Sequence, residues 1–315
     1  MTMQSIRVFA PATVANVSCG FDVLGFALHR PGDMVEMHLN DTGRVTLDQV
    51  EGDDGKLPRD PEANIASAVV IKFLQHLQSP HGFSMKLHKQ MPFGSGLGSS
   101  SASAVAGLVA ANELLGRPMT REELLPFAME GERISSGNAH ADNVAPALLG
   151  GLVLIRSYEP LDVIRLPYPE NLFAALVYPH VEIPTMEARR IIKSSITMKN
   201  AIRQWGNVGG LVAGFCTGDM DLIGRSMVDV VVEPIRAMLI PMFYEMRELA
   251  LEHHALGFGI SGSGPTVFAL CKQQDHASHI ATVLSDLLQQ NGIESTPYVS
   301  EINKDGPVVF GESGK

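Results

Sequence analysis

The sequence predicts an α+β fold divided into two domains. The 315 residues, 45% of them hydrophobic, exceed what one hydrophobic core usually organises. The first third of the chain alternates apolar and polar residues as antiparallel or mixed strands do, whereas the later part interleaves strands with helices. A turn that ends in Pro160 separates the two parts, so we place the domains at residues 1–159 and 160–315.

Strands dominate the beginning of the first domain, and helices follow them. Alternation predicts strands over residues 6–10, 23–28, 34–39, 83–87 and 152–157. Apolar residues at helical spacing predict helices over residues 63–77, 102–115, 121–135 and 139–149. Thr120 followed by Glu123 forms a capping-box pattern at the start of the third helix.

The second domain reads as strands and helices in succession. Strands are expected over residues 173–178, 266–271 and 295–301, with one more short strand before residue 266. Helices are expected over residues 186–193, 197–216, 222–231, 241–254 and 276–290. This order again indicates an α+β arrangement.

Composition excludes several classes of function. A formal net charge of −10 and the lack of a dense Lys/Arg cluster argue against a nucleic-acid partner. No apolar run reaches the roughly 18 residues of a membrane span, and the first residues lack a secretory signal pattern, so we expect a cytoplasmic protein. The three cysteines form no CxxC pair, which argues against a disulfide framework or a zinc site.

The most informative segment is a glycine- and serine-rich run directly before an Ala-rich helix. Small residues there expose several backbone N–H groups, and the helix N-terminus adds its positive dipole end, so the segment is typical of a phosphate-binding loop. The segment is not a Walker A loop, because that motif has a Lys after its last Gly. It also departs from the dinucleotide fingerprint, which has a Gly where Ser99 stands. In an acidic chain such a loop points to a small nucleotide with Mg²⁺; a glycine turn that merely caps a helix is the alternative.

Three further segments of the chain contain residues that could belong to the same site. Asn16 and Asp22 stand in an apolar context, where they form either an Asx turn or a site for a hydroxyl or carboxylate and an ammonium group. Residues 130–143 concentrate carboxylates, a His and amides, from which Glu132 together with Ser100 would supply oxygen ligands for Mg²⁺. A second glycine-rich turn, residues 257–266, is either a plain hairpin or a backbone that approaches the first loop and braces phosphates or substrate.

Taken in this order, the loop and the three segments resemble those of the GHMP small-molecule kinases, and within that superfamily those of the homoserine kinases. The superfamily resemblance is carried by PFGSGLGSSSA and GISGSGPT. The resemblance to the narrower family is carried by ATVANVSCGFDVLGFAL, GNAHADNVAPALLGG, IPTMEAR and VVEPIRAMLIP, and it spans most of the chain. It implies an N-terminal domain similar to ribosomal protein S5, a ferredoxin-like C-terminal domain, and an active site between them.

The resemblance also implies ligands and their residues. ATP would contact Asn64 and the loop residues Pro92, Phe93, Gly94, Ser95, Gly96, Leu97, Gly98, Ser99, Ser100, Ser101 and Ala102. Mg²⁺ would be held by Ser100 and Glu132, although Ser99 could supply the hydroxyl instead. Homoserine would be surrounded by Asn16, Asp22, His140, Thr185, Arg189, Arg236 and Gly262.

The expected reaction transfers a phosphoryl group from ATP to the side-chain hydroxyl of homoserine, a step of threonine biosynthesis. Asn143 would orient the hydroxyl, and Asp142 either accepts its proton or only organises the start of a helix. Glu132 counts with them among the catalytic residues. The alternatives are a related kinase for another small alcohol and a nucleotide sensor without activity; a homodimer is an expectation from the resemblance.

Overall fold

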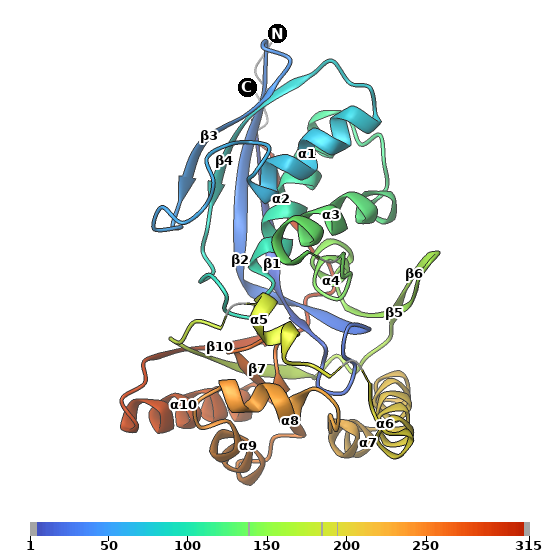
Figure 1. Ribbon diagram of the computed structural model, residues 1–315, viewed down its shortest axis with the longest axis vertical. Helices are drawn as coiled ribbons and strands as arrows, with labels where there is room; N and C mark the ends of the chain where they lie inside the picture. The colour runs from blue at the N-terminus through green and yellow to red at the C-terminus, as the bar shows by residue number, and fades with distance from the viewer. Residues whose placement is uncertain (1–4, 138, 184, 194, 312–315) are drawn as a thin grey trace.

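The computed structural model describes residues 5–137, 139–183, 185–193 and 195–311. Within these ranges the chain forms two sheets, which lie one above the other in Figure 1. The larger, seven-stranded sheet has the order β11-β1-β2-β4-β3, with β5 beside β2 and β6 beside β5. Its strands are β1 (Ser5–Ala15), β2 (Leu24–Asn40), β3 (Val45–Glu51), β4 (Gly82–His88), β5 (Leu152–Tyr158), β6 (Leu161–Leu166) and β11 (Val308–Gly311).

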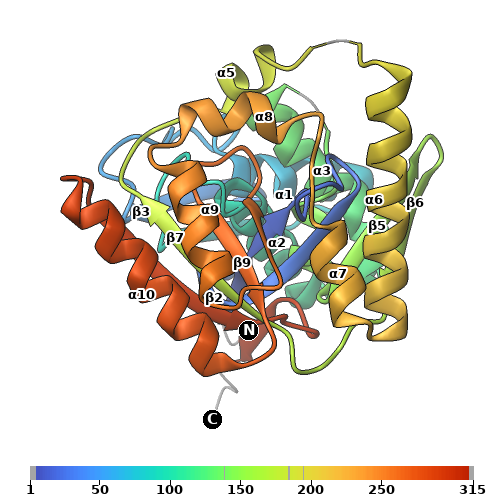
Figure 2. The ribbon, with the colours of Figure 1, turned by 90° about the horizontal axis from the view of Figure 1, so that it is seen from below.

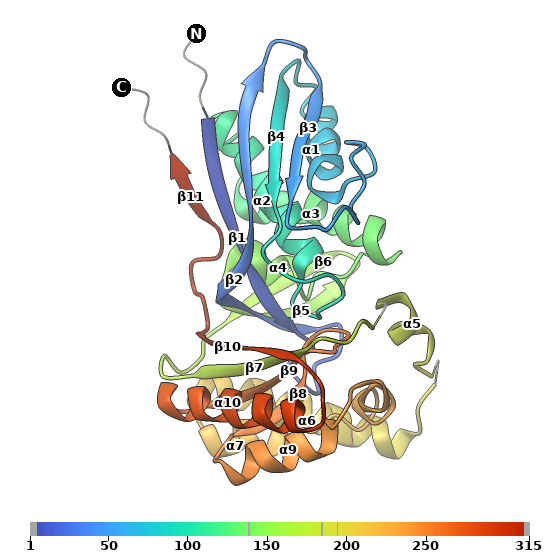
Figure 3. The same cartoon turned by 90° about the vertical axis from the view of Figure 1, so that its left-hand side faces the viewer.

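Four helices pack against one side of this sheet, as Figure 3 shows. They are α1 (Ile65–His76), α2 (Ser99–Leu114), α3 (Arg121–Ser136) and α4 (Val144–Leu149). Helix α2 lies in their middle and is buried all round, which explains its many small residues. A side chain at Gly107 would lie 2.5 Å from the carbonyl oxygen of Ala66, so glycine lets α1 approach α2 closely. The middle of α2 is thereby packed against the first turn of α1.

The smaller sheet has the order β10-β7-β9-β8 and separates two hydrophobic cores. Its strands are β7 (Phe173–Pro179), β8 (Gly257–Ile260), β9 (Val267–Cys271) and β10 (Ser295–Glu301). Side chains alternate along β9: Val267 and Ala269 face the helices below, while Phe268 joins the core of the larger sheet and meets Phe26 edge-on at 6.1 Å. The two halves of the molecule therefore share a continuous apolar contact.

The α-helices described in residues 185–193 and 195–290 belong to the half that contains the smaller sheet, and Figure 2 shows them from below. They are α5 (Thr185–Arg190), α6 (Met198–Thr217), α7 (Met220–Ser226), α8 (Glu233–Arg236), α9 (Phe243–Glu252) and α10 (Gln274–Gln290). Helices α9 and α10 cover the outer face of the sheet, with residues such as Met246 and Leu284 in the second core. No helix in the described ranges is long and apolar enough to span a membrane.

The α+β prediction is confirmed, but several elements differ from it. The strands expected at 23–28 and 34–39 form the single strand β2, which passes through Pro31. The helix expected from residue 139 begins only at Val144, and the helix expected over 222–231 ends at Ser226. Strands β3, β6 and β11 were not predicted; β3 pairs in parallel with β4, whereas β6 and β11 pair with β5 and β1 along the borders of the sheet.

The turn before Pro160, where we expected the second domain to begin, joins β5 to β6 within the larger sheet. Strand β11, near the end of the chain, returns to the same sheet and pairs with β1. Pro is equally common in hairpin turns and in linkers, so it does not distinguish them. We propose that the first domain comprises residues 5–166 with β11, and that the second begins in the connection before β7.

Candidate active site

The glycine- and serine-rich segment connects β4 to α2 as a backbone turn, in which Phe93 is exposed and the other residues are partly or fully buried. Gly94, Gly96 and Gly98 all have positive φ angles, of 61°, 80° and 69°, which only glycine adopts at little cost. Gly98 is the N-cap residue of α2 and offers no side-chain cap. The first amide groups of α2 therefore face the loop with their dipoles aligned, as an anion-binding helix start requires.

A cavity of about 380 Å³ opens beside this loop. Eight of the expected ATP-binding residues line it: Asn64, Phe93, Gly94, Ser95, Gly96, Gly98, Ser99 and Ser100. Pro92, Leu97, Ser101 and Ala102 do not, and the last three are fully buried. Asn64 is the N-cap of α1, where its Oδ1 accepts a bond from the Ala66 amide (3.1 Å) and its Nδ2 donates to the Pro58 carbonyl (3.0 Å).

The second glycine turn joins the antiparallel strands β8 and β9 as a hairpin and also lies directly against the first turn, so both interpretations left open by the sequence apply. Thr266 donates its amide to the Ser95 carbonyl at 3.1 Å, and the Ser261 hydroxyl donates to the Gly96 carbonyl at 2.8 Å. A side chain at Gly96 would lie only 2.5 Å from the Ser261 carbonyl oxygen. Bare backbone is thus needed for the two turns, one from each half of the molecule, to meet at the cavity.

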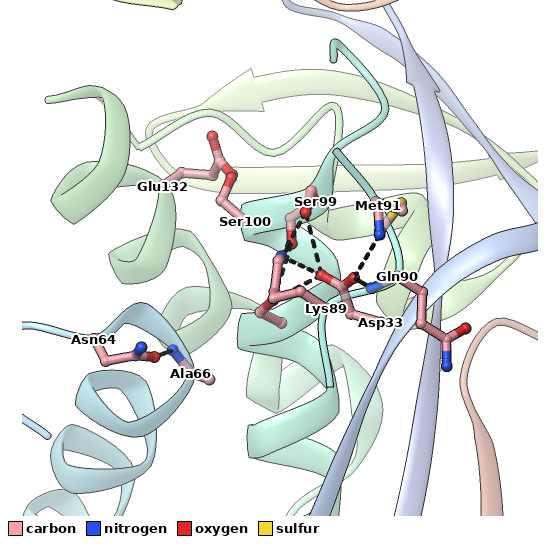
Figure 4. A network of polar contacts seen from close by, with 10 residues as sticks. Asp33, Asn64, Ala66, Lys89, Gln90, Met91, Ser99, Ser100 and Glu132 are labelled. Atoms are coloured by element: carbon pink, nitrogen blue, oxygen red, sulfur yellow. Dashed lines mark hydrogen bonds and ion pairs between the residues drawn. The ribbon is translucent and has the colours of Figure 1, made fainter. Parts of the chain in front are cut away.

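Glu132 reaches the start of α2 from α3 (Figure 4). Its Oε1 accepts hydrogen bonds from the hydroxyls of Ser100 (3.0 Å) and Ser101 (2.5 Å). Burial raises the pKa of the Glu132 carboxyl, and these two bonds oppose the shift. The Ser99 hydroxyl is held elsewhere, by Asp33 and Lys89, so Ser100 rather than Ser99 is the loop serine that faces Glu132.

A buried carboxylate beside hydroxyls is a set of hard oxygen donors, which suits Mg²⁺. Ser100 and Glu132 both line the cavity, next to the amides that would meet phosphate. Among the described residues there is no group of three or more His, Cys, Asp or Glu side chains that could hold a metal alone. The donors on this chain therefore fit a cation that completes its coordination with phosphate oxygens and water.

A cluster of charged side chains lies on the other side of the second glycine turn. Both terminal nitrogens of Arg189 donate to the Asp22 carboxylate, at 2.5 and 3.3 Å. Asn16 fixes the turn that presents Asp22, because its Oδ1 accepts the Asp22 amide (3.0 Å) while its Nδ2 donates to the Gly262 carbonyl (2.7 Å). The sequence left an Asx turn open at Asn16 and Asp22, but the bond between them spans six positions, whereas an Asx turn spans two.

Arg236 joins this cluster from α8 and is almost fully buried. Its Nη1 donates to the Gly262 carbonyl at 3.0 Å and its Nε to the Ala188 carbonyl at 3.2 Å. The guanidinium groups of Arg236 and Arg189 both lie over the Phe21 ring, at 5.2 and 5.4 Å from its centroid. Burial lowers the pKa of Arg236 to about 10, which leaves it charged at neutral pH.

His140 completes the side of the cluster that faces the loop. Its Nδ1 lies 3.6 Å from Asp22 Oδ1, and neither ring nitrogen has a hydrogen-bond partner among the described residues. Burial lowers the pKa of His140, helped by the charges of Arg189 and Arg236 and opposed by Asp22. The neutral ring can then donate one hydrogen bond and accept another. The remaining expected residue, Thr185, begins α5, but its side chain lies outside the described part of the structure.

Asn143 and Asp142 stand between the cavity and the charged cluster, but only Asn143 lines the cavity. Its Oδ1 accepts a hydrogen bond from the Thr13 hydroxyl at 2.7 Å, which points the amide nitrogen away from Thr13. Asp142 is buried, and desolvation raises the pKa of its carboxyl to about 8, with further increases from the charges of Asp22 and Glu132. At neutral pH Asp142 is therefore mostly protonated.

Sequence reasoning missed several residues of the site. Lys89 and Glu182 line the cavity, Thr13 orients Asn143, and Asp33 binds Lys89. Lys89 and Asp33 carry no motif and are far apart along the chain. Asp33 directly precedes the strand expected over residues 34–39, and Lys89 follows the one expected over 83–87, so no local pattern marked either residue.

Comparison with known proteins identifies the family. Residues 64–151 match the GHMP kinases N terminal domain and residues 211–290 the GHMP kinases C terminal domain. The chain is 52% identical to the homoserine kinase of Chlorobium phaeovibrioides over 98% of this chain and all of that protein. It belongs to the homoserine kinase family.

Structures agree with this assignment to the homoserine kinase family. The crystal structure of homoserine kinase from Cytophaga hutchinsonii superimposes with a TM-score of 0.95 at 53% identity, covering 97% of both chains. A galactokinase from Lactococcus lactis superimposes with a TM-score of 0.71 at 14% identity, which shows the fold alone. The two-domain GHMP kinase fold expected from the sequence is thus confirmed.

Proposed function

We propose that this chain transfers the γ-phosphoryl group of ATP to the side-chain hydroxyl of L-homoserine. The observation that carries the proposal is the junction at Gly262. This residue lines the nucleotide cavity, and its carbonyl accepts bonds from Asn16 and Arg236 of the charged cluster. A phosphate-binding site and a site for an amino acid are thereby joined through one glycine turn.

ATP is proposed to lie in the 380 Å³ cavity with its phosphates on the loop amides and its base toward Asn64. The charged residues in the lining are Lys89, Glu132 and Glu182, and the Lys89 ammonium group already contacts Asp33. The described lining therefore has little positive charge for a triphosphate beyond the amides and the helix dipole. Ser100 and Glu132 would hold Mg²⁺, which when bound neutralises phosphate charge and orients the phosphates.

Homoserine is proposed to bind between Asp22 and the two arginines. The substrate carries one ammonium and one carboxylate group, and the cluster offers one carboxylate, which pairs with Arg189, and two guanidinium groups over the same Phe21 ring. The zwitterion would insert into the Asp22–Arg189 pair and keep every charge paired. Mevalonate and shikimate lack an ammonium group, so neither could supply the positive charge that is proposed to pair with Asp22.

The transfer requires little acid–base chemistry from the protein. The homoserine hydroxyl oxygen forms a bond to the γ-phosphorus while the bond to the β–γ bridging oxygen breaks, and ADP leaves. Asn143 is placed to orient the hydroxyl, because Thr13 fixes its amide at the edge of the cavity. A protonated Asp142 cannot accept the hydroxyl proton, so we propose that it shapes the start of α4 and that the proton leaves with the phosphate or solvent.

The direct test measures ADP release with homoserine, with mevalonate, with shikimate and without acceptor, each with and without Mg²⁺. We expect release only with homoserine and Mg²⁺. Glu132→Gln should lower kcat/KM at least about hundredfold, because it removes the charge that holds the cation. The matched control is Glu130→Gln: this carboxylate is on the same helix but contacts Lys72 and Arg133 instead, so activity should persist.

Release of ADP with another alcohol at higher kcat/KM would reassign the chain to a sibling kinase. Nucleotide binding without turnover of any acceptor would favour a sensor. The homodimer and the cytoplasmic location expected from the sequence stay proposals, which size-exclusion chromatography with light scattering and cell fractionation would test.

A further inference from the structure

A buried polar cluster ties together the two ends of the phosphate-binding loop. Asp33, in the middle of β2, is fully buried. Figure 4 shows its carboxylate among Lys89, Gln90, Met91 and Ser99. The first three precede the loop and the last begins α2, so one side chain from a different strand reaches both sides of the loop.

The two carboxylate oxygens divide this work. Asp33 Oδ1 accepts the amides of Gln90 (3.0 Å) and Met91 (3.3 Å), on the N-terminal side of the loop. Asp33 Oδ2 accepts the hydroxyls of Ser99 (3.2 Å) and Ser103 (2.8 Å), on the C-terminal side, and also the Lys89 ammonium group, which reaches it from the N-terminal side. The carboxylate therefore fixes the separation between the point where the loop leaves β4 and the point where α2 begins.

Lys89 reinforces the same connection. Its Nζ contacts Asp33 Oδ2 and the Ser99 hydroxyl, and donates to the Ser99 carbonyl at 3.1 Å and to Ser103 Oγ at 2.9 Å. The Lys89 side chain is only 4% exposed. A charge pair buried this deeply is costly unless all its members are bonded, and removing one partner leaves the other uncompensated.

We infer that Asp33, together with Lys89, is a positioning residue that sets the geometry of the phosphate-binding loop. The loop itself contains three glycines at positive φ and has few side chains to hold it. Its amides can bind phosphate strongly only when their directions are fixed in advance. Asp33 supplies this constraint from outside the loop, without contact to the nucleotide. The inference rests on the proposed function because ATP is the ligand whose binding it affects.

Asp33→Asn is the sharpest variant. The amide keeps one oxygen for Gln90 and Met91 but places an NH₂ group against Lys89 and Ser103, so it should release only the α2 side of the loop. We expect the KM for ATP and the dissociation constant of a non-hydrolysable ATP analogue to rise about tenfold or more, as for a lost bond to a charged group. The KM for homoserine should stay within about twofold, since Asp33 touches none of its residues.

Ser103→Ala provides a milder variant should Asp33→Asn fail to fold. It removes one donor to Oδ2 and leaves both charges, so the dissociation constant of the analogue should rise about threefold. The matched control is Asn112→Ala on the same helix, because Asn112 is buried and bonds the Met119 backbone away from the cavity. It should lower thermal stability and leave nucleotide binding unchanged.

The inference would be overturned if folded Asp33→Asn bound the nucleotide analogue as tightly as the unaltered protein does. If Asp33→Asn does not fold, the same result for Ser103→Ala would overturn it. An equal loss of affinity in Asn112→Ala would also overturn it, since the effect would then be general destabilisation. Binding of the analogue needs no acceptor. A chain that binds it but phosphorylates no homoserine would refute the proposed function and leave the role of Asp33 testable.

Discussion

The nucleotide cavity and the charged cluster are built on opposite principles. The cavity includes the glycine-rich loop and the start of α2, which offer backbone amides to a ligand, and the one ammonium group in its described lining, that of Lys89, is already paired with Asp33. The cluster consists of charged side chains from the β1–β2 connection, α5 and α8; Arg189 pairs with Asp22 across the two halves of the molecule, and Arg189 and Arg236 both lie over the Phe21 ring. Backbone suits a ligand shared by many kinases, whereas side chains can be changed to select the acceptor.

This contrast predicts that a substitution in the charged cluster changes the KM for homoserine without changing the KM for ATP. Asp22→Asn removes the only carboxylate that contacts Arg189 among the described residues, and with it the partner proposed for the substrate ammonium group. We expect the KM for homoserine to rise about a hundredfold, as for a lost charge-assisted contact. The KM for ATP should remain within about twofold. Initial rates over a grid of both substrate concentrations measure the two constants together.

A matched pair on α5 controls for this result. Arg189 contacts Asp22, whereas the neighbouring Arg190 is exposed. Arg189→Met should reproduce the rise in the homoserine KM, and Arg190→Met should leave both constants unchanged. An equal rise in the two KM values for Asp22→Asn would show that the cluster and the cavity act as one site.

A smaller effect is expected where the two sites meet. Asp142 is mostly protonated at pH 7 because burial raises its pKa to about 8, so Asp142→Asn should retain turnover within about threefold. A fall of a hundredfold or more at saturating substrates would instead assign it the role of base. Steady-state kcat at pH 7 separates these outcomes.

The same carboxyl should affect stability with a defined sign. Its pKa is higher in the folded chain than the ordinary value of 3.8, so the folded state holds the proton more tightly. Its contribution to the free energy of unfolding is full below pH 4 and is lost as the pH rises through 8. As the pH rises from about 4 to about 8, the free energy of unfolding of Asp142→Asn should therefore fall less than that of the unaltered protein. Urea unfolding at several pH values would measure this difference.

Local patterns in the sequence were sufficient for part of this picture. The phosphate-binding loop and the second glycine turn are continuous segments, so their glycine and serine content was enough to predict a site at each of them. Thr120 and Glu123 likewise form the capping box that their spacing indicated. Ser100 and Glu132 were paired as oxygen donors from their residue types and again through the family resemblance, and the structure brings them within hydrogen-bond distance.

What the sequence did not predict depends on contacts between distant segments. Asp33 and Lys89 are separated by 56 positions and have no meaning until β2 and β4 become neighbours. Strand β11 returns to β1 from the far end of the chain, so no turn links it to the sheet it joins. The raised pKa of Asp142 likewise follows from burial, which no local pattern reveals.

The most direct test of the account is a crystal structure with a non-hydrolysable ATP analogue, Mg²⁺ and homoserine bound together. We expect the phosphates on the amides of residues 94–101, the ammonium group of homoserine on Asp22, and its hydroxyl between Asn143 and the γ-phosphate. An analogue bound away from this loop, or homoserine bound with its hydroxyl facing away from the nucleotide, would contradict the account.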